Sequence, residues 1–271
     1  MATAIWKGHI AFGLVSIGVA VTAATESRTV AFRQVHRPDS SRIRQERRCE
    51  AEDKPVPWDE VVKGYQTSDG RIVQVTEEDL ASLPLPTKRR IEVLEFVPAH
   101  SVDPIYFSSA YYLGPVDETA VRPYLLLRDT LEESGRLAVT KVALRNRERV
   151  AVLRVVGAAI CLQTMLWPDE VRAPELTELS AVGPVEAGSQ EMEMARLLID
   201  SMSVETFDAS QYRDEYREKL LELIDAKIAG REVHVPAPRA EEIVTPDLAE
   251  ALQASLAAAK AGRSRLQGNR R

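Results

Sequence analysis

The sequence predicts a mixed fold in which a strand-rich body is followed by α-helices. Apolar, β-branched runs at Leu137–Leu144 and Val150–Val156 are too hydrophobic for surface strands and indicate a buried sheet. From Gly188 onward, the apolar residues recur with the period of amphipathic helices. With 271 residues the chain is long for one domain and short for two, so we expect one large core with an appendage.

The N-terminal part is predicted to be mainly extended. Ile10–Val21 is interpreted as one long strand, with Gly8, Gly13 and Gly18 as places where either another backbone packs closely or the strand coils. Thr29–Val35 is interpreted as a second strand. Trp58–Lys63 predicts one or two helical turns. The turn residues of Ser68–Gly70 then precede a strand at Arg71–Val75.

Helices and strands are predicted to alternate in the middle of the chain. Thr76 followed by Asp79 resembles a capping box, which predicts a short helix at Glu77–Leu83. A longer helix is expected from about Ala120 to a C-cap at Gly135, because apolar residues recur there at helical spacing. Further strands are predicted at Ile91–Val97 and Ala158–Trp167.

The C-terminal part is predicted to be helical. Amphipathic spacing marks one helix around Met194–Met202 and a second at Tyr212–Ile228, which ends at Gly230. An alanine-rich helix is expected from Thr245 to near Gly262. These boundaries divide the chain into a strand-rich core at 1–185, a helical arm at 186–230, and a linker, short helix and basic tail at 231–271.

The charge of the chain is segregated. The net charge is −6, which alone argues against a nucleic-acid partner. From Arg33 to Arg48, however, six arginines face only Asp39 and Glu46, a local balance of +4 that leaves −10 for the rest. Arginine binds phosphate through two parallel hydrogen bonds, so this segment suits a polyanionic backbone.

A second basic cluster lies between the two apolar strands. Arg145, Arg147 and Arg149 alternate along the chain, which places them on one face if the segment is extended. This face either contacts a polyanion or is a solvated hairpin end. The main concentration of aromatic residues in the chain either belongs to the core or stacks on bases; its members are Tyr106, Phe107, Tyr111 and Tyr112.

The sequence gives little support for catalysis or for a membrane span. Cys49 and Cys161 are far apart, the four histidines form no ligand pair, and neither a P-loop nor a dinucleotide motif is present. No apolar run approaches eighteen residues, and the N-terminus does not resemble a signal peptide. We therefore expect a cytoplasmic binding protein, not an enzyme, with no metal or cofactor.

Several blocks of the sequence closely resemble the bacterial Ku proteins. They fall in the family's order and cover about Ala4–Gly230. The blocks are AIWKGHIAFGLVSIGV at 4–19, SRIRQERRC at 41–49, KGY at 63–65 with SDG at 68–70, IEVLEFVPAHSVDPIYF at 91–107, and ALRNRERVAVLR at 143–154. One departure is that Cys49 is followed by Glu50, Ala51 and Glu52, where many relatives have C-x-x-C-G.

The resemblance implies a fold and a function. The family's core is a β-barrel whose extended arms form a ring around duplex DNA as a homodimer, followed by C-terminal helices that embrace the partner protomer. Its members bind and protect double-stranded DNA ends in non-homologous end joining, and they recruit the end-joining ligase, ligase D. A cytoplasmic, nucleoid-associated protein would follow.

The ring hypothesis assigns DNA contacts to two groups of cations. We expect the inner face of the ring to be lined by Arg42, Arg44, Arg47, Arg145, Arg147 and Arg149, with Arg33, Arg37 and Lys7 as further contributors. One alternative is a β-barrel enzyme whose arginines hold a phosphorylated small molecule. Another is a protein-only scaffold in which the arginines form salt bridges.

Overall fold

A computed structural model describes residues 3–83, 87, 89–144, 147–175, 189–231, 251–255 and 257. The chain divides into two compact units, Met1–Ala173 and Pro174–Arg271. The predicted division at residues 185 and 230 remains a prediction. Among the described residues, no helix is both long and apolar enough to span a bilayer.

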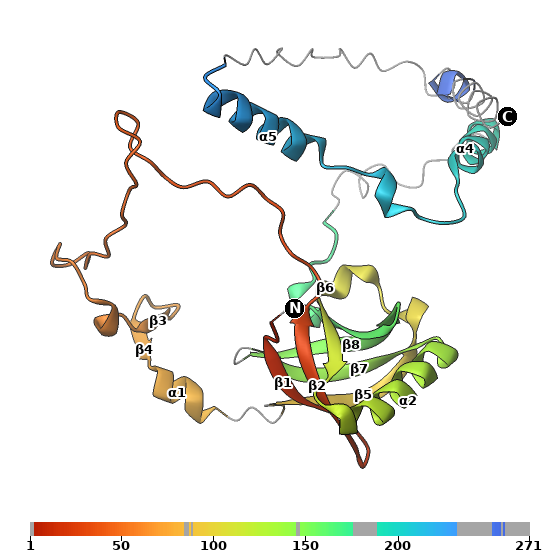
Figure 1. Ribbon diagram of the computed structural model, residues 1–271, viewed down its shortest axis with the longest axis horizontal. Coiled ribbons are helices and arrows are strands. Elements are labelled where there is room, and N and C mark those ends of the chain that lie inside the picture. Colours follow the sequence, from red (N-terminus) through yellow and green to blue (C-terminus); the bar gives the residue numbers. More distant parts are fainter. Residues whose placement is uncertain are drawn as a thin grey trace. The chain divides into compact units, whose positions relative to one another are not determined.

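Seven strands of the first unit close into a barrel (Figure 1). Their order around the barrel is β1 (Trp6–Phe12), β2 (Val15–Ala23), β6 (Phe107–Pro115), β9 (Ala159–Met165), β8 (Arg147–Val156), β7 (Arg136–Leu144) and β5 (Arg90–Pro98). All neighbours are antiparallel except β1 and β5, which run parallel. The closed barrel with additional helices confirms the predicted fold class.

One helix, α2 (Glu118–Ser134), packs on the barrel and completes its core. Asp117 caps its first turn, and it ends at Gly135, whose φ of 61° is the left-handed conformation predicted for a C-cap. The buried hydroxyl of Tyr124 donates to the carbonyl of Leu113 at 2.7 Å and accepts from the amide of Ile160 at 2.8 Å. The helix is thereby fixed to two strands through their backbones.

The prediction of one strand at Ile10–Val21 is wrong. β1 and β2 form a hairpin in which Phe12 pairs with Val15, so Gly13 and Leu14 make a two-residue turn. Gly13 has a φ of 57°, which glycine adopts without strain. The glycine at position 8 does permit a close approach, as expected, because a Cβ there would collide with the Trp6 ring and the Arg89 carbonyl.

Residues 24–89 leave the barrel after β2 and return to it at β5; we call this segment the arm (Figure 1). The strand predicted at Thr29–Val35 is absent, because only Val35 finds a bridge partner, Arg42. The regular elements of the arm are a 3-10 turn (Trp58–Glu60), the hairpin of β3 (Lys63–Gln66) and β4 (Ile72–Val75), and α1 (Glu77–Ser82). The capping box of Thr76 and Asp79 is confirmed.

The described part of the second unit is helical, as the sequence predicts. α4 (Ser189–Met202) and α5 (Glu215–Ile228) are joined by a short 3-10 turn, Ala209–Gln211. Residues 251–255 are also helical, whereas the predicted linker and the basic tail lie outside the described residues. The remaining 3-10 turns are Ala99–Ser101, Pro104–Tyr106 and Pro168–Glu170.

Candidate nucleic-acid interface

The first half of the arm presents free guanidinium groups. Its predicted contact residues are fully on the surface, and within the described chain none of their side chains has an acidic partner; they are Arg33, Arg37, Arg42 and Arg44. A small turn carries them, in which Asp39 accepts hydrogen bonds from the backbone and hydroxyl of Ser41. These bonds, led by the Ser41 amide, hold the pKa of Asp39 below its usual value. The carboxylate of Asp39 therefore stabilises the turn and does not pair with the neighbouring arginines.

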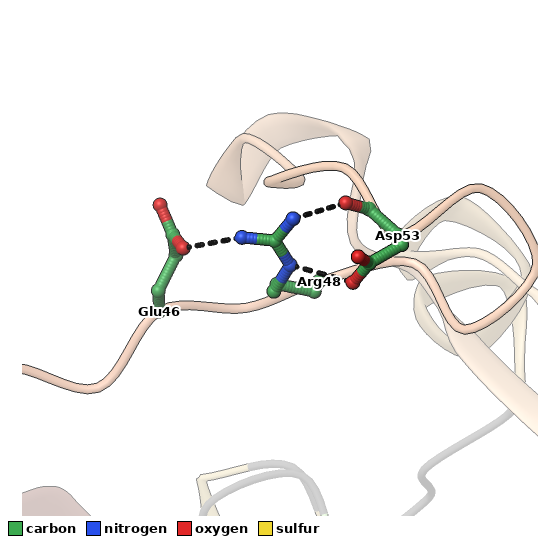
Figure 2. Close-up of polar contacts among 3 residues, drawn as sticks. All are labelled: Glu46, Arg48 and Asp53. Atoms are coloured by element: carbon green, nitrogen blue, oxygen red, sulfur yellow. Dashed lines mark hydrogen bonds and ion pairs between the residues drawn. The ribbon is translucent and has the colours of Figure 1, made fainter.

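A tight loop follows at residues 46–55, and Arg48 closes it. Its guanidinium donates to the Asp53 carboxylate at 2.8 Å and to Glu46 at 3.1 Å, and it also reaches the Asp53 carbonyl (Figure 2). The backbone of Cys49 bonds to Lys54 and Asp53 across the loop, where Asp53 takes a φ of 51°. Arg48 is thus occupied by an intramolecular clip, which we call the Arg48 clip: Glu46, Arg48 and Asp53.

Arg47 lies beside the clip but is not part of it. Its guanidinium lies 4.1 Å from the centre of the Trp58 ring, within cation–π distance. The backbone carbonyl of Arg47 accepts from Val56 at 2.8 Å, which draws the two ends of the loop together and brings Trp58 near. Arg47 therefore has a fixed direction while its hydrogen-bond donors remain available.

The second predicted cluster lies at one end of the barrel. Arg147 and Arg149 begin β8 and pair with Leu144 and Val142 of β7. They continue the row of core-facing residues in β8, Arg149 half-buried and Arg147 exposed at the start of the strand, and both line one cavity at this end of the barrel. Glu148 between them faces the other way, 3.9 Å from Lys141. The period-two prediction is confirmed for this pair; Arg145 lies outside the described residues.

Lys7 and two arginines that the sequence reasoning missed lie elsewhere on the barrel. Lys7 is exposed on β1 and has the opposite orientation to Trp6, so it does not reach the cavity of Arg147. Arg89 and Arg90, where the arm returns, line an open hollow with His9. The sequence signal that could have indicated them is the pair of adjacent arginines directly before the predicted strand. In the described chain, no group of three His, Cys, Asp or Glu side chains is arranged to hold a metal ion.

Comparison with known proteins decides the family. The family model of the Ku70/Ku80 beta-barrel domain matches residues 11–194, which include the whole arm and all of the barrel except the first five residues of β1. The chain belongs to the Ku family. The arginine-rich segment of the arm lies within the matched residues, and the family is the one that the sequence motifs indicated.

Curated Ku relatives cover nearly all of the chain. Non-homologous end joining protein Ku from Frankia casuarinae is 52% identical over 264 residues, 96% of this chain and 65% of that protein. Ku from Mycobacterium tuberculosis is 40% identical over 270 residues, 98% of this chain and 97% of that protein. Ku 2 from Saccharopolyspora erythraea is 44% identical over 261 residues, 96% of this chain and 85% of that protein. The chain thus spans about two thirds of the Frankia protein but almost all of the mycobacterial one.

Among solved structures, the SPOC domain of human PHD-finger protein 3 gives a TM-score of 0.30 at 12% identity. That match covers 60% of this chain and 95% of the SPOC domain. The likeness is too weak to bear on fold or function.

Proposed function

We propose that this Ku family member binds the ends of double-stranded DNA, without sequence preference, in non-homologous end joining. The observation that carries the proposal is the arm: exposed arginines that have no acidic partner in the described part of the chain, in a family whose curated members are named for end joining. Contacts to phosphate give affinity that is independent of base sequence and driven by counterion release. The family supports a binding protein and not an enzyme.

The proposed DNA contacts are those that the sequence indicated. Arg42, Arg44 and Arg47 form the centre of the interface on the arm, and Arg33, Arg37 and Lys7 add to it. The acidic remainder of the chain would repel DNA from other surfaces and direct it to the basic ones. Arg145, Arg147 and Arg149 form the second group of contacts.

A ring that encloses duplex DNA requires a second protomer. The described helices of the second unit expose large apolar side chains, among them Met202, Tyr216 and Ile228, each at least 70% exposed. Exposed apolar surface of this kind is typical of an interface. We propose that these helices embrace the partner copy, that the homodimer protects DNA ends and recruits ligase D, and that it acts in the cytoplasm on the nucleoid. Sedimentation should then give twice 30.1 kDa.

The ring is tested by competition between two DNA forms. Purified protein is bound to a labelled linear duplex and challenged with unlabelled DNA of the same sequence, either linear or covalently closed. A ring that threads onto ends is displaced by the linear competitor and hardly by the circle. Equal competition would refute end binding, and a monomer at micromolar concentration would refute the ring.

A further inference from the structure

A cavity of about 270 Å³ opens at the end of the barrel where β8 begins. Its walls are Ile5, Trp6, Tyr111, Leu144, Arg147 and Arg149. Tyr124 of α2 is attached near the other end of β8, because it bonds to Ile160 and Ile160 pairs with Val155. The helix therefore packs away from this opening. At the opening, the row of core-facing residues in β8 ends with Arg147 and Arg149.

The two guanidiniums in this cavity have no anionic partner within the described chain. Glu148, the nearest acid in sequence, lies on the other face of β8, where Thr87 donates to it at 3.0 Å and Lys141 lies 3.9 Å away. Among the residues that the structure describes, no acid lines the cavity. Arg149 is half-buried between the barrel core and the opening, so its charge is partly removed from water. Such a group favours an anion that can accept charge-assisted hydrogen bonds.

The other walls are aromatic and aliphatic. The Trp6 ring lies against Gly8, where any side chain would collide with it, so its position is fixed by packing. Tyr111 faces the same interior from β6 and packs against the core. Flat apolar walls beside two guanidiniums match a ligand that carries an aromatic ring and a phosphate.

We propose that this cavity takes one nucleotide, with its phosphate between Arg147 and Arg149 and its base against Trp6 and Tyr111. The volume is close to the lower limit of ligand pockets, about 300 Å³, which suits a single nucleotide. A base inside a duplex is paired and stacked and cannot enter. The nucleotide is therefore either free or the unpaired terminal residue of a DNA strand; the second source rests on the proposed function.

The first arm of the test uses free ligands and the full-length chain. Binding of deoxyadenosine 5′-monophosphate is measured by calorimetry and by fluorescence quenching, with a Trp6→Phe variant to assign the signal. The nucleotide should bind at least about tenfold more tightly than deoxyadenosine, the equivalent of one charge-assisted hydrogen bond. Arg147→Gln/Arg149→Gln should remove that advantage. Arg154→Gln is the matched control, because Arg154 lies on the same strand and instead bonds to Gln163.

The second arm compares a blunt duplex with one that carries a single unpaired, 5′-phosphorylated nucleotide. The cavity predicts tighter binding of the second duplex. The double variant should lose that preference, which is measured as the ratio of the two dissociation constants, so that a loss of affinity common to both duplexes cancels. Preference for the overhang without binding of the free nucleotide supports the strand as the source; the reverse result supports a free nucleotide. If neither the free nucleotide nor the overhang is preferred by the wild-type chain, the inference is overturned. Failure of the wild-type chain to bind either duplex would instead refute the proposed function.

Discussion

The guanidinium of Arg47 stacks 4.1 Å from the centre of the Trp58 ring, while its neighbour Arg48 is bound to two carboxylates. Two adjacent arginines in one basic segment therefore have different tasks. Arg48 folds the loop, whereas Arg47 lies over the Trp58 ring and keeps its hydrogen-bond donors available. Counting charges along the segment cannot separate these tasks, although they determine which side chain can reach a phosphate.

Removing the free arginines of the arm should weaken DNA binding. Arg42→Gln/Arg44→Gln is expected to lower the affinity for linear duplex and to reduce the slope of log K against log salt by about 0.9 for each phosphate that is no longer neutralised. Binding is measured between low and moderate salt. Arg28→Gln/Arg71→Gln removes the same charge from arginines already paired with Glu26 and Asp69. An equal loss of affinity in both variants would contradict a specific role for Arg42 and Arg44.

Opening the Arg48 clip should also weaken binding, although it removes a negative charge. Asp53→Gly keeps the positive φ accessible and deletes the carboxylate that holds Arg48. If the clip orients Arg47, affinity falls severalfold in a mobility-shift titration. Glu50→Gln removes one acid from the same loop and should leave affinity unchanged or slightly raised. Tighter binding by Asp53→Gly would show that only net charge matters.

The Tyr124 hydroxyl should contribute to the stability of the barrel. Tyr124→Phe leaves the carbonyl of Leu113 and the amide of Ile160 without their buried partner, which we expect to cost about 1–3 kcal/mol of unfolding free energy. Urea denaturation followed by circular dichroism measures the change. Tyr65→Phe is the control, since Tyr65 is 67% exposed and should lose almost nothing. Equal urea midpoints for Tyr124→Phe and the wild type would show that the Tyr124 hydroxyl does not stabilise the barrel.

The two thiols should differ in reactivity. Burial raises the pKa of Cys161, which lowers its thiolate fraction at mildly alkaline pH, and the side chain is also only 1% exposed. Cys49, in the loop of the arm, is only half-buried. Under native conditions, iodoacetamide should modify Cys49 and spare Cys161 until denaturant is added. Mass spectrometry of the digested protein identifies the site, and rapid native labelling of Cys161 would mean that the barrel opens there.

Much of the fold could be predicted because its signals are local. The capping box at Thr76 and the left-handed Gly135 involve neighbouring residues only. The turn at Gly13 was missed because apolar residues continue on both sides of it, which resembles one uninterrupted strand. β3 was missed because all four of its residues are exposed and it is ordered only by pairing with β4.

The sequence predicted which residues form the candidate site, but not where their side chains point. Alternation correctly placed Arg147 and Arg149 on one face. That this face is the barrel interior depends on their register with Val142 and Leu144, which no local pattern contains. Likewise, the role of Arg48 depends on the loop that brings Asp53 back to it. Long-range pairing is therefore where sequence reasoning fails in this chain.

Trapping on DNA tests the ring most directly. Protein is loaded onto linear duplex biotinylated at both ends, streptavidin then blocks the ends, and the complex is washed with about 1 M salt, where electrostatic contacts are screened within about 3 Å. A closed ring should remain bound to DNA whose ends are blocked and should dissociate from DNA whose ends are free. It should also fail to load when streptavidin is added before the protein. Equal release from blocked and open DNA would contradict encirclement.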